Sequence, residues 1–239
     1  MGSSNIALGF QALRANTTAS NNTALGRQSL YSNTTGSNNT ASGYQTLFTN
    51  TTGINNTAYG AESLRQNLTT EANVAIGYRS LYNNTTSNNT SIGTQAAFTN
   101  TTGAGLTAVG FQSLLSNTTG NFNTTLGYGA LYSNTTGSKN TASGYQALYS
   151  NTTGGSNTAV GYEAARSLTT GISNVYFGHR AGRSNTTASN QVMIGSSAGY
   201  GSTANNNVGI GASALYSNTG GNNVAVGYAA GNANITGVA

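Results

Sequence analysis

The stretch NNTALGRQSLYSN (residues 21–33) returns seventeen positions later as NNTASGYQTLFTN (residues 38–50). Aligned on the glycine inside each stretch, the chain contains fourteen such units, and three of the intervals between them are one position shorter than the rest. Self-similarity at a short fixed period is the signature of a solenoid, in which each coil pairs its backbone with the next. The sequence therefore predicts an all-β parallel β-solenoid of about fourteen 17-residue coils. The repeat glycines are Gly9, Gly26, Gly43, Gly60, Gly77, Gly93, Gly110, Gly127, Gly144, Gly161, Gly178, Gly195, Gly211 and Gly227.

The residues around each glycine alternate in size. Two positions before it stands a small residue such as Ala24, with Tyr176 and Met193 as exceptions. Alternate residues of a strand share a face, so we expect the alanines and glycines to form a tight inner face. The segment QSLYS (residues 28–32) indicates a second short strand, and NTTG (residues 33–36) indicates a turn. The expected coil is a flat two-sided β-roll whose Leu, Ile and Tyr side chains stay exposed unless another chain covers them.

Polar residues also recur at fixed positions, as Asn22 and Asn39 do before Thr23 and Thr40. Identical side chains in successive coils are expected to stack into hydrogen-bonded ladders, as Asn and Thr do in sheets. For asparagine, simple exposure to water explains the pattern equally well. For threonine the alternative is weaker, because Val replaces it readily and both residues are β-branched.

The composition excludes several classes of protein. Only 5% of the residues are charged, and there is no Cys, which removes disulfides and Cys-based zinc sites. No window approaches 18 apolar residues and the first ten lack a basic region, so neither a membrane span nor a signal peptide is predicted. The net charge of +5 comes from scattered residues rather than a basic patch, which argues against nucleic-acid binding.

The carboxylates do not suggest catalysis. Glu62 and Glu163 stand at the same position of the repeat, six coils and roughly 29 Å apart, too far for a catalytic pair. Glu71, in the loop NLTTEAN, is expected to be a solvated charge. There is no Asp to build a calcium loop. We therefore predict no catalytic residue, no cofactor and no metal site, and no enzymatic activity.

His179 is the only histidine, within GHRAGR, where Arg180 and Arg183 surround it with positive charge. A threefold axis could bring three copies of His179 together as a metal or anion site. Its position holds Tyr or Phe in most coils, however, so an ordinary packed or exposed histidine is favoured. His179, Arg180 and Arg183 are the candidate partner-binding residues.

A second column of the repeat is aromatic. Stacked rings along a solenoid can pack an interface between chains or offer a platform for sugars, and packing is favoured because each ring can bury a large area. The members of this column are Tyr31, Phe48, Tyr82, Phe98, Tyr132, Tyr149 and Tyr216.

The coils diverge toward the C-terminus. Residues 1–161 repeat regularly, whereas residues 162–239 continue the same solenoid with Val at the Thr position and with Ala165, Gly182 and Gly199 at the Leu position. Terminal repeats are often atypical because they cap the array. The divergent section is therefore predicted to be a cap, a junction or the region that binds, and we favour binding.

The strand motif resembles a known family. NVAIG (residues 73–77), NTAVG (residues 157–161) and NVAVG (residues 223–227) resemble the head repeat of YadA-type trimeric autotransporter adhesins. The units are also similar to repeats in bacterial and phage proteins described as tail-fibre-domain proteins. The resemblance implies a left-handed parallel β-roll, assembled as a homotrimer and exposed on a cell or virion. It also implies a host-cell surface or glycan receptor as partner.

These observations favour a structural attachment fibre, a segment of a surface adhesin or tail fibre, located outside the cell. The alternative is an ice-binding solenoid, which the threonine ladders suggest. That alternative is weaker, because the adjacent threonines of NTT point in opposite directions.

Overall fold

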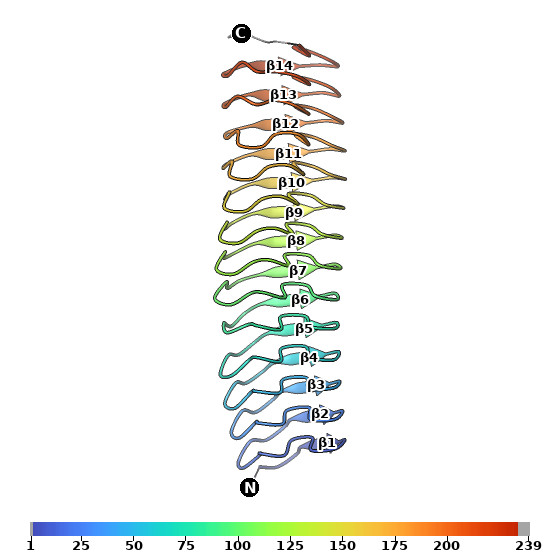
Figure 1. The fold of residues 1–239 in the computed structure, drawn as a ribbon, viewed down its shortest axis with the longest axis vertical. Helices are drawn as coiled ribbons and strands as arrows, with labels where there is room; N and C mark the ends of the chain where they lie inside the picture. Colours follow the sequence, from blue (N-terminus) through green and yellow to red (C-terminus); the bar gives the residue numbers. More distant parts are fainter. Residues whose placement is uncertain (1, 234–239) are drawn as a thin grey trace. The chain divides into compact units, whose positions relative to one another are not determined.

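The computed structural model of the chain describes residues 2–233. The chain divides into two compact units, Met1–Phe122 and Asn123–Ala239. Each unit is a parallel β-solenoid with one three-residue strand per coil (Figure 1). This confirms the predicted all-β solenoid and its period. Residues 2–233 form no helix, and so none that is long and apolar enough to cross a membrane.

The strands of each unit follow one another in chain order. In the first unit they are β1 (Ile6–Leu8), β2 (Thr23–Leu25), β3 (Thr40–Ser42), β4 (Thr57–Tyr59), β5 (Val74–Ile76), β6 (Thr90–Ile92) and β7 (Thr107–Val109). In the second they are β8 (Thr124–Leu126), β9 (Thr141–Ser143), β10 (Thr158–Val160), β11 (Val175–Phe177), β12 (Val192–Ile194), β13 (Val208–Ile210) and β14 (Val224–Val226). Consecutive strands of a unit pair in parallel, residue against equivalent residue, as Thr23 pairs with Thr40. Equivalent positions therefore lie side by side in columns.

The glycine after each strand is required by the contact between coils. Gly43 has a φ of +137°, a conformation that side chains rarely adopt. A Cβ on Gly43 would lie 2.7 Å from the carbonyl carbon and oxygen of Gly60 in the next coil. The predicted inner face is thus only half right. The alanines point inward and are fully buried, as Ala41 is, but the glycines are needed where one backbone passes over the next.

The predicted second strand is wrong. Residues 28–32 and their equivalents within the described part of the chain form turns instead. Gln45 and Leu47 have φ values of 51° and 49°, and a backbone with positive φ cannot continue a strand. The turn directs Leu47 inward, where it is fully buried, so this leucine is core and needs no second chain to cover it. Each such leucine stabilises the fold by about 1.5–3 kcal/mol.

Two asparagine ladders run through the core. In the first ladder, the backbone N–H of Asn39 donates to Oδ1 of Asn22 (2.9 Å), and Nδ2 of Asn39 donates to the carbonyl of Gly53 (2.8 Å). In the second, Nδ2 of Asn50 donates to Oδ1 of Asn33 (2.8 Å). All four asparagines are fully buried. The predicted hydrogen-bonded ladder is confirmed, and simple exposure to water is ruled out for these residues.

Packing accounts for the divergence of two coils in the second unit. Tyr176 replaces the buried alanine of β11 and Gly182 replaces the buried leucine of the same coil; a Cβ on Gly182 would lie 2.1 Å from the Tyr176 ring. Met193 and Gly199 make the same exchange one coil later. The Tyr176 hydroxyl accepts a hydrogen bond from Nδ2 of Asn185 (2.7 Å). A large residue on one side of the coil is therefore matched by a glycine on the other.

Candidate binding surface

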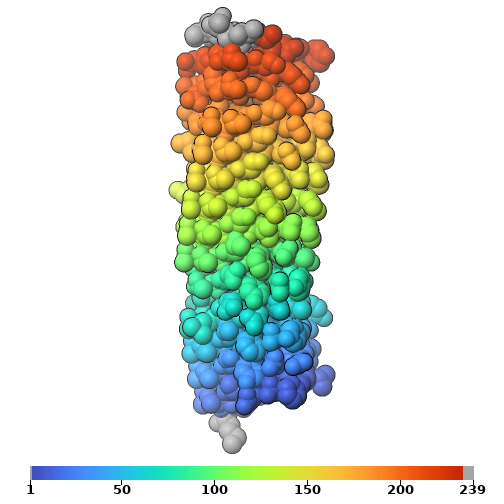
Figure 2. Space-filling view, viewed as in Figure 1, coloured from blue at the N-terminus to red at the C-terminus, as the bar shows by residue number. Residues whose placement is uncertain are grey.

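The side chains on the outside of the coils are the candidates for function. In each unit the coils follow one another in chain order, shown as successive colours in Figure 2. Residues 2–233 enclose no pocket, and they hold no group of three or more His, Cys, Asp or Glu able to bind a metal ion. The outward columns of the repeat are therefore the candidate binding surfaces.

The first of these surfaces consists of two columns, the first and the third residues of the strands. We call it the sheet face. The middle residue of each strand points inward, so these two point outward. No residue of this face is charged in either unit. Its exposed apolar members are Ile6, Leu8, Leu25, Tyr59, Ile76 and Ile92 in the first unit and Leu126, Val175, Phe177, Ile194, Ile210, Val224 and Val226 in the second. The face is uncharged and partly apolar along each unit.

Beside the sheet face, the residues after the repeat glycines form a ring ladder in the second unit. Tyr128 stacks on Tyr145 (centroids 5.3 Å apart), Tyr145 on Tyr162 (5.1 Å), and Tyr162 on His179 (5.4 Å). The rings are nearly parallel, with interplanar angles of 17°, 9° and 12°. His179 is exposed and continues this ladder. Its placement fits the ordinary exposed histidine that the sequence favoured.

The predicted aromatic column also stacks within the chain. Tyr31 and Phe48 lie 5.0 Å apart between centroids, and Tyr132 and Tyr149 lie 4.9 Å apart. Arg65 extends the column, because its guanidinium lies over both Phe48 (5.2 Å) and Tyr82 (5.7 Å). These rings are half-buried, so part of each ring's area is already covered by its neighbours in the same chain.

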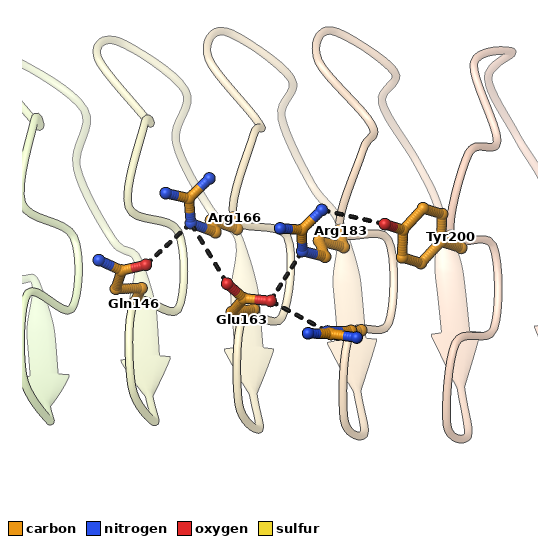
Figure 3. A network of polar contacts seen from close by, with 6 residues as sticks. Gln146, Glu163, Arg166, Arg183 and Tyr200 are labelled. Atoms are coloured by element: carbon orange, nitrogen blue, oxygen red, sulfur yellow. Dashed lines mark hydrogen bonds and ion pairs between the residues drawn. The ribbon is translucent and has the colours of Figure 1, made fainter.

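The densest group of charges surrounds one carboxylate of the second unit (Figure 3). Glu163, whose side chain is only 9% exposed, accepts hydrogen bonds from Nε of Arg183 (2.7 Å) and Nε of Arg180 (3.0 Å). Nε of Arg166 lies 3.6 Å from the other carboxylate oxygen and donates to Oε1 of Gln146 (2.9 Å). Nη1 of Arg183 donates to the hydroxyl of Tyr200 (2.9 Å). We call Gln146, Glu163, Arg166, Arg180, Arg183 and Tyr200 the Glu163 cluster.

The charges in this cluster hold one another in the ionised state. Hydrogen bonds from Arg183 and then Arg180 lower the pKa of Glu163, against the opposing effect of burial. The bond to Glu163 raises the pKa of Arg183. Hydrogen bonds from Ser184 and Arg183 lower the pKa of the Tyr200 phenol. Three arginines against one glutamate leave the cluster with a net charge of +2.

A simpler version of the cluster occurs in the first unit, at equivalent positions of the repeat. Glu62 accepts from Nε of Arg79 at 2.6 Å, and this bond raises the pKa of Arg79. Nε of Arg65 donates to Oε1 of Gln45 (3.1 Å). Where the Glu163 cluster has Arg183, this Glu62 cluster has Tyr82. Its net charge is therefore +1, from two arginines and one glutamate.

The structure brings the three predicted binding residues together, but not as the sequence suggested. Arg180 and Arg183 pair with Glu163 instead of simply crowding His179 with positive charge. Arg180 also lies over the ring of Tyr162, on which His179 stacks. Glu163 was not predicted from the sequence as their partner. Arg180 stands one full repeat after Glu163, and Arg183 follows three positions later, so the repeat itself could have revealed the contact.

No family model, curated protein or solved structure matches this chain. The resemblance to adhesin and tail-fibre repeats therefore remains a prediction from motifs such as the one at residues 157–161.

Proposed function

We propose that this chain is a segment of a structural attachment fibre, in which three copies pack side by side through their sheet faces. The observation that carries the proposal is the uncharged apolar sheet face, repeated coil after coil in each unit. Extended apolar patches on a soluble protein mark interaction sites. Covering this face would bury the outward Leu, Ile and Val side chains of the strands.

A second copy of the same chain is the occupant that best matches this face. Successive outward residues are spaced at about 4.8 Å along the sheet, and a partner must follow that spacing over seven strands in each unit. An identical chain does so by construction, and a rotation axis along the sheet stack closes the assembly. The resemblance to YadA-type heads supports three copies and a left-handed coil. The polar and aromatic columns then stay outside, free to contact a cell surface or glycan.

The test is the mass of the protein under native conditions. We expect three chains for the unaltered protein and single chains for the double variant Ile194→Lys with Ile210→Lys, because six buried ammonium groups cannot be accommodated in a trimer. The control is Ile172→Lys, which places one such charge outside the strands of the same unit. Ile172 is 51% exposed, compared with 37% and 38% for the two sheet-face residues. A folded, monomeric unaltered protein would reject the trimer.

Ice binding is the second candidate, and one observation favours it. The first residue of many strands is an exposed threonine, as at Thr40 and Thr57 in the first unit and Thr124 and Thr141 in the second. These hydroxyl and methyl groups lie in one column, spaced at about 4.8 Å where consecutive strands both begin with threonine. The other outward residue is usually Leu, Ile or Val, so a strand offers at most one outward threonine, and the strands that begin with Ile or Val offer none. Thermal hysteresis with faceted ice crystals would rank this function above attachment.

A further inference from the structure

We propose that the Glu163 cluster binds the acidic group of a polysaccharide, a carboxylate or sulfate carried on a sugar. This rests on the proposed attachment function and names its ligand class. Of the chain's eleven charged residues, eight basic and three acidic, four lie in this cluster. They are gathered in one short stretch of the sequence, from Glu163 to Arg183. No other stretch of this length in the chain contains three basic residues.

Comparison with the Glu62 cluster shows that Arg183 is not needed to build the coil. The Glu62 cluster keeps the glutamate and two of the arginines and has Tyr82 where Arg183 stands. There, Arg65 stacks between two rings and donates from Nη1 to the hydroxyl of Tyr82 (3.2 Å). The coil therefore folds with only two arginines at these positions. The third raises the net charge from +1 to +2 and adds a guanidinium at the surface.

The geometry leaves hydrogen-bond donors available for a ligand. Within residues 2–233, Arg180 donates to Glu163, and Arg166 to Gln146, through Nε. The side chains of Arg180, Arg166 and Arg183 are 42%, 33% and 27% exposed. A guanidinium presents its donors in a planar fork that matches a carboxylate or sulfate. Glu163 already holds these guanidinium groups in place. Ligand binding therefore has to order fewer side chains and costs less conformational entropy.

The neighbouring ring ladder suits a sugar chain. Tyr162 and His179 are exposed beside Arg180, and the Tyr162 ring is stacked between those of Tyr145 and His179. A tyrosine offers an apolar body and a hydroxyl tip, which fits the mixed surface of a sugar ring. Tyr128 and Tyr145 repeat this arrangement in the two coils before Tyr162. A linear polysaccharide lying along the ladder would meet one exposed ring per coil and end at the arginines.

A nucleic acid is the less suitable polyanion for this surface. Nucleic-acid binding relies on a basic patch or stripe that follows the phosphate backbone. Here the basic residues beside the ladder are confined to one cluster, and the ladder itself consists of uncharged tyrosines ending in His179. An acidic sugar needs only one or a few anionic groups at the cluster, with neutral contacts elsewhere. The experiment below includes an oligonucleotide so that it can decide between the two.

The experiment measures dissociation constants by calorimetry for the full chain, at about 0.15 M salt so that distant charges are screened. The probes are a galacturonic acid hexamer, a sulfated heparin hexasaccharide, neutral maltohexaose and a six-nucleotide DNA. The variants Arg183→Tyr and Arg180→Gln restore residues that the repeat uses at these positions, such as Tyr82 and Gln146, so both are expected to fold. The control Lys139→Asn removes one positive charge from an exposed position of the same unit.

We expect an acidic hexasaccharide to bind and maltohexaose to bind far more weakly. Arg183→Tyr and Arg180→Gln should each weaken acidic binding on the order of tenfold, as loss of one charge-assisted contact implies, and Lys139→Asn less than twofold. Whether the carboxylated or the sulfated probe binds more tightly identifies the acidic group. Undiminished binding by Arg183→Tyr, an equal loss in Lys139→Asn, or equal binding of the DNA would overturn the site.

The mass of each variant under native conditions separates this inference from the proposed assembly. A monomer that binds acidic sugars through Arg183 would reject the trimer and keep the site. A trimer that binds none of the acidic probes would reject the site and leave the assembly standing.

Discussion

At the scale of single residues, the structure changes which glycines matter. From the sequence, replacing Gly144, whose position is glycine in every coil, with Val is expected to be far more damaging than replacing Gly137 in the loop with Ser. Gly144 is indeed constrained, with a φ of +139° and a prospective Cβ 2.3 Å from the carbonyl oxygen of Gly161. At Gly137 the prospective Cβ lies 2.3 Å from the carbonyl oxygen of Gly154 and 2.5 Å from Oδ1 of Asn134. Both glycines are therefore fixed by contact between coils.

We predict that Gly144→Ala and Gly137→Ala each lower the free energy of unfolding, by about 1–3 kcal/mol, because a methyl group at either position forces the coils apart. Urea denaturation of each variant measures the loss. Gly201→Ala is the control, since the nearest atom to its Cβ would be 3.5 Å away, an ordinary contact. If Gly137→Ala is as stable as Gly201→Ala, the loop can shift to make room for the methyl group.

A second residue-scale prediction concerns a break in the second asparagine ladder. Leu168 occupies an asparagine position, and Oδ1 of Asn151, buried in the preceding coil, has no hydrogen-bond donor within the described chain. In an intact stretch, Asn50→Leu should leave Oδ1 of Asn33 equally unpaired and cost about 1–3 kcal/mol. Leu168→Asn should be tolerated, because its amide can donate to Asn151. Urea midpoints for both variants test this; equal losses would contradict it.

At the scale of the element, the exchange of bulk between Tyr176 and Gly182 predicts strong coupling. Gly182→Leu alone should unfold or severely destabilise the second unit, since the new side chain would occupy the space of the Tyr176 ring. Adding Tyr176→Ala restores the alanine and leucine pairing seen at Ala142 and Leu148, and should recover most of the stability. A double-mutant cycle on melting temperature measures the coupling. Additive effects would show that the two positions do not share one space.

The Glu163 cluster predicts that stability depends on pH, because its ion pairs link one coil to the next. Its arginines lower the folded-state pKa of Glu163, so its contribution is complete above the unfolded value, about 4.3, and is lost as the pH falls through the folded pKa. Glu163→Gln introduces the residue that Gln146 provides at the same position of the preceding coil. At about pH 7 this variant should therefore have a lower melting temperature than the unaltered protein. We expect the difference to shrink below about pH 4. Glu71→Gln, which removes an exposed carboxylate, is the control; a gap unchanged down to about pH 3 would contradict the ion pairs.

The same element explains what the sequence could and could not predict. The period, the strand and the buried alanines follow from the spacing of small and β-branched residues. The turn at residues 44–49 does not, because Gln45 and Leu47 adopt a left-handed conformation that costs isolated residues roughly 1–2 kcal/mol. Hydrogen bonds between coils offset that cost, as when Leu47 donates to the carbonyl of Ser63 (3.1 Å). These bonds appear only once coils are stacked.

The candidate site was predictable to a similar extent. The sequence singles out Arg180 and Arg183 because they surround the only histidine, His179, with positive charge. It does not reveal that Glu163 joins them, since that contact depends on the register between coils. Thr158 of β10 pairs with Val175 of β11, one full repeat later, so Glu163 and Arg180 fall in one column. The pair becomes visible in the sequence when residues are aligned by their column in the repeat and not by their distance along the chain.

At the scale of the whole molecule, association through the sheet face should make stability depend on concentration. Assembly stabilises the folded state by mass action, so the melting temperature of the unaltered protein should rise with protein concentration. The double variant Ile194→Lys with Ile210→Lys should show no such rise, because the charges prevent the faces from meeting. Ile172→Lys, outside the sheet face, should keep it. Melting curves over a hundredfold range of concentration make the comparison. If the melting temperature of the unaltered protein does not change with concentration, its apolar columns are stable in water without a partner. An attachment fibre would then have to consist of a single chain.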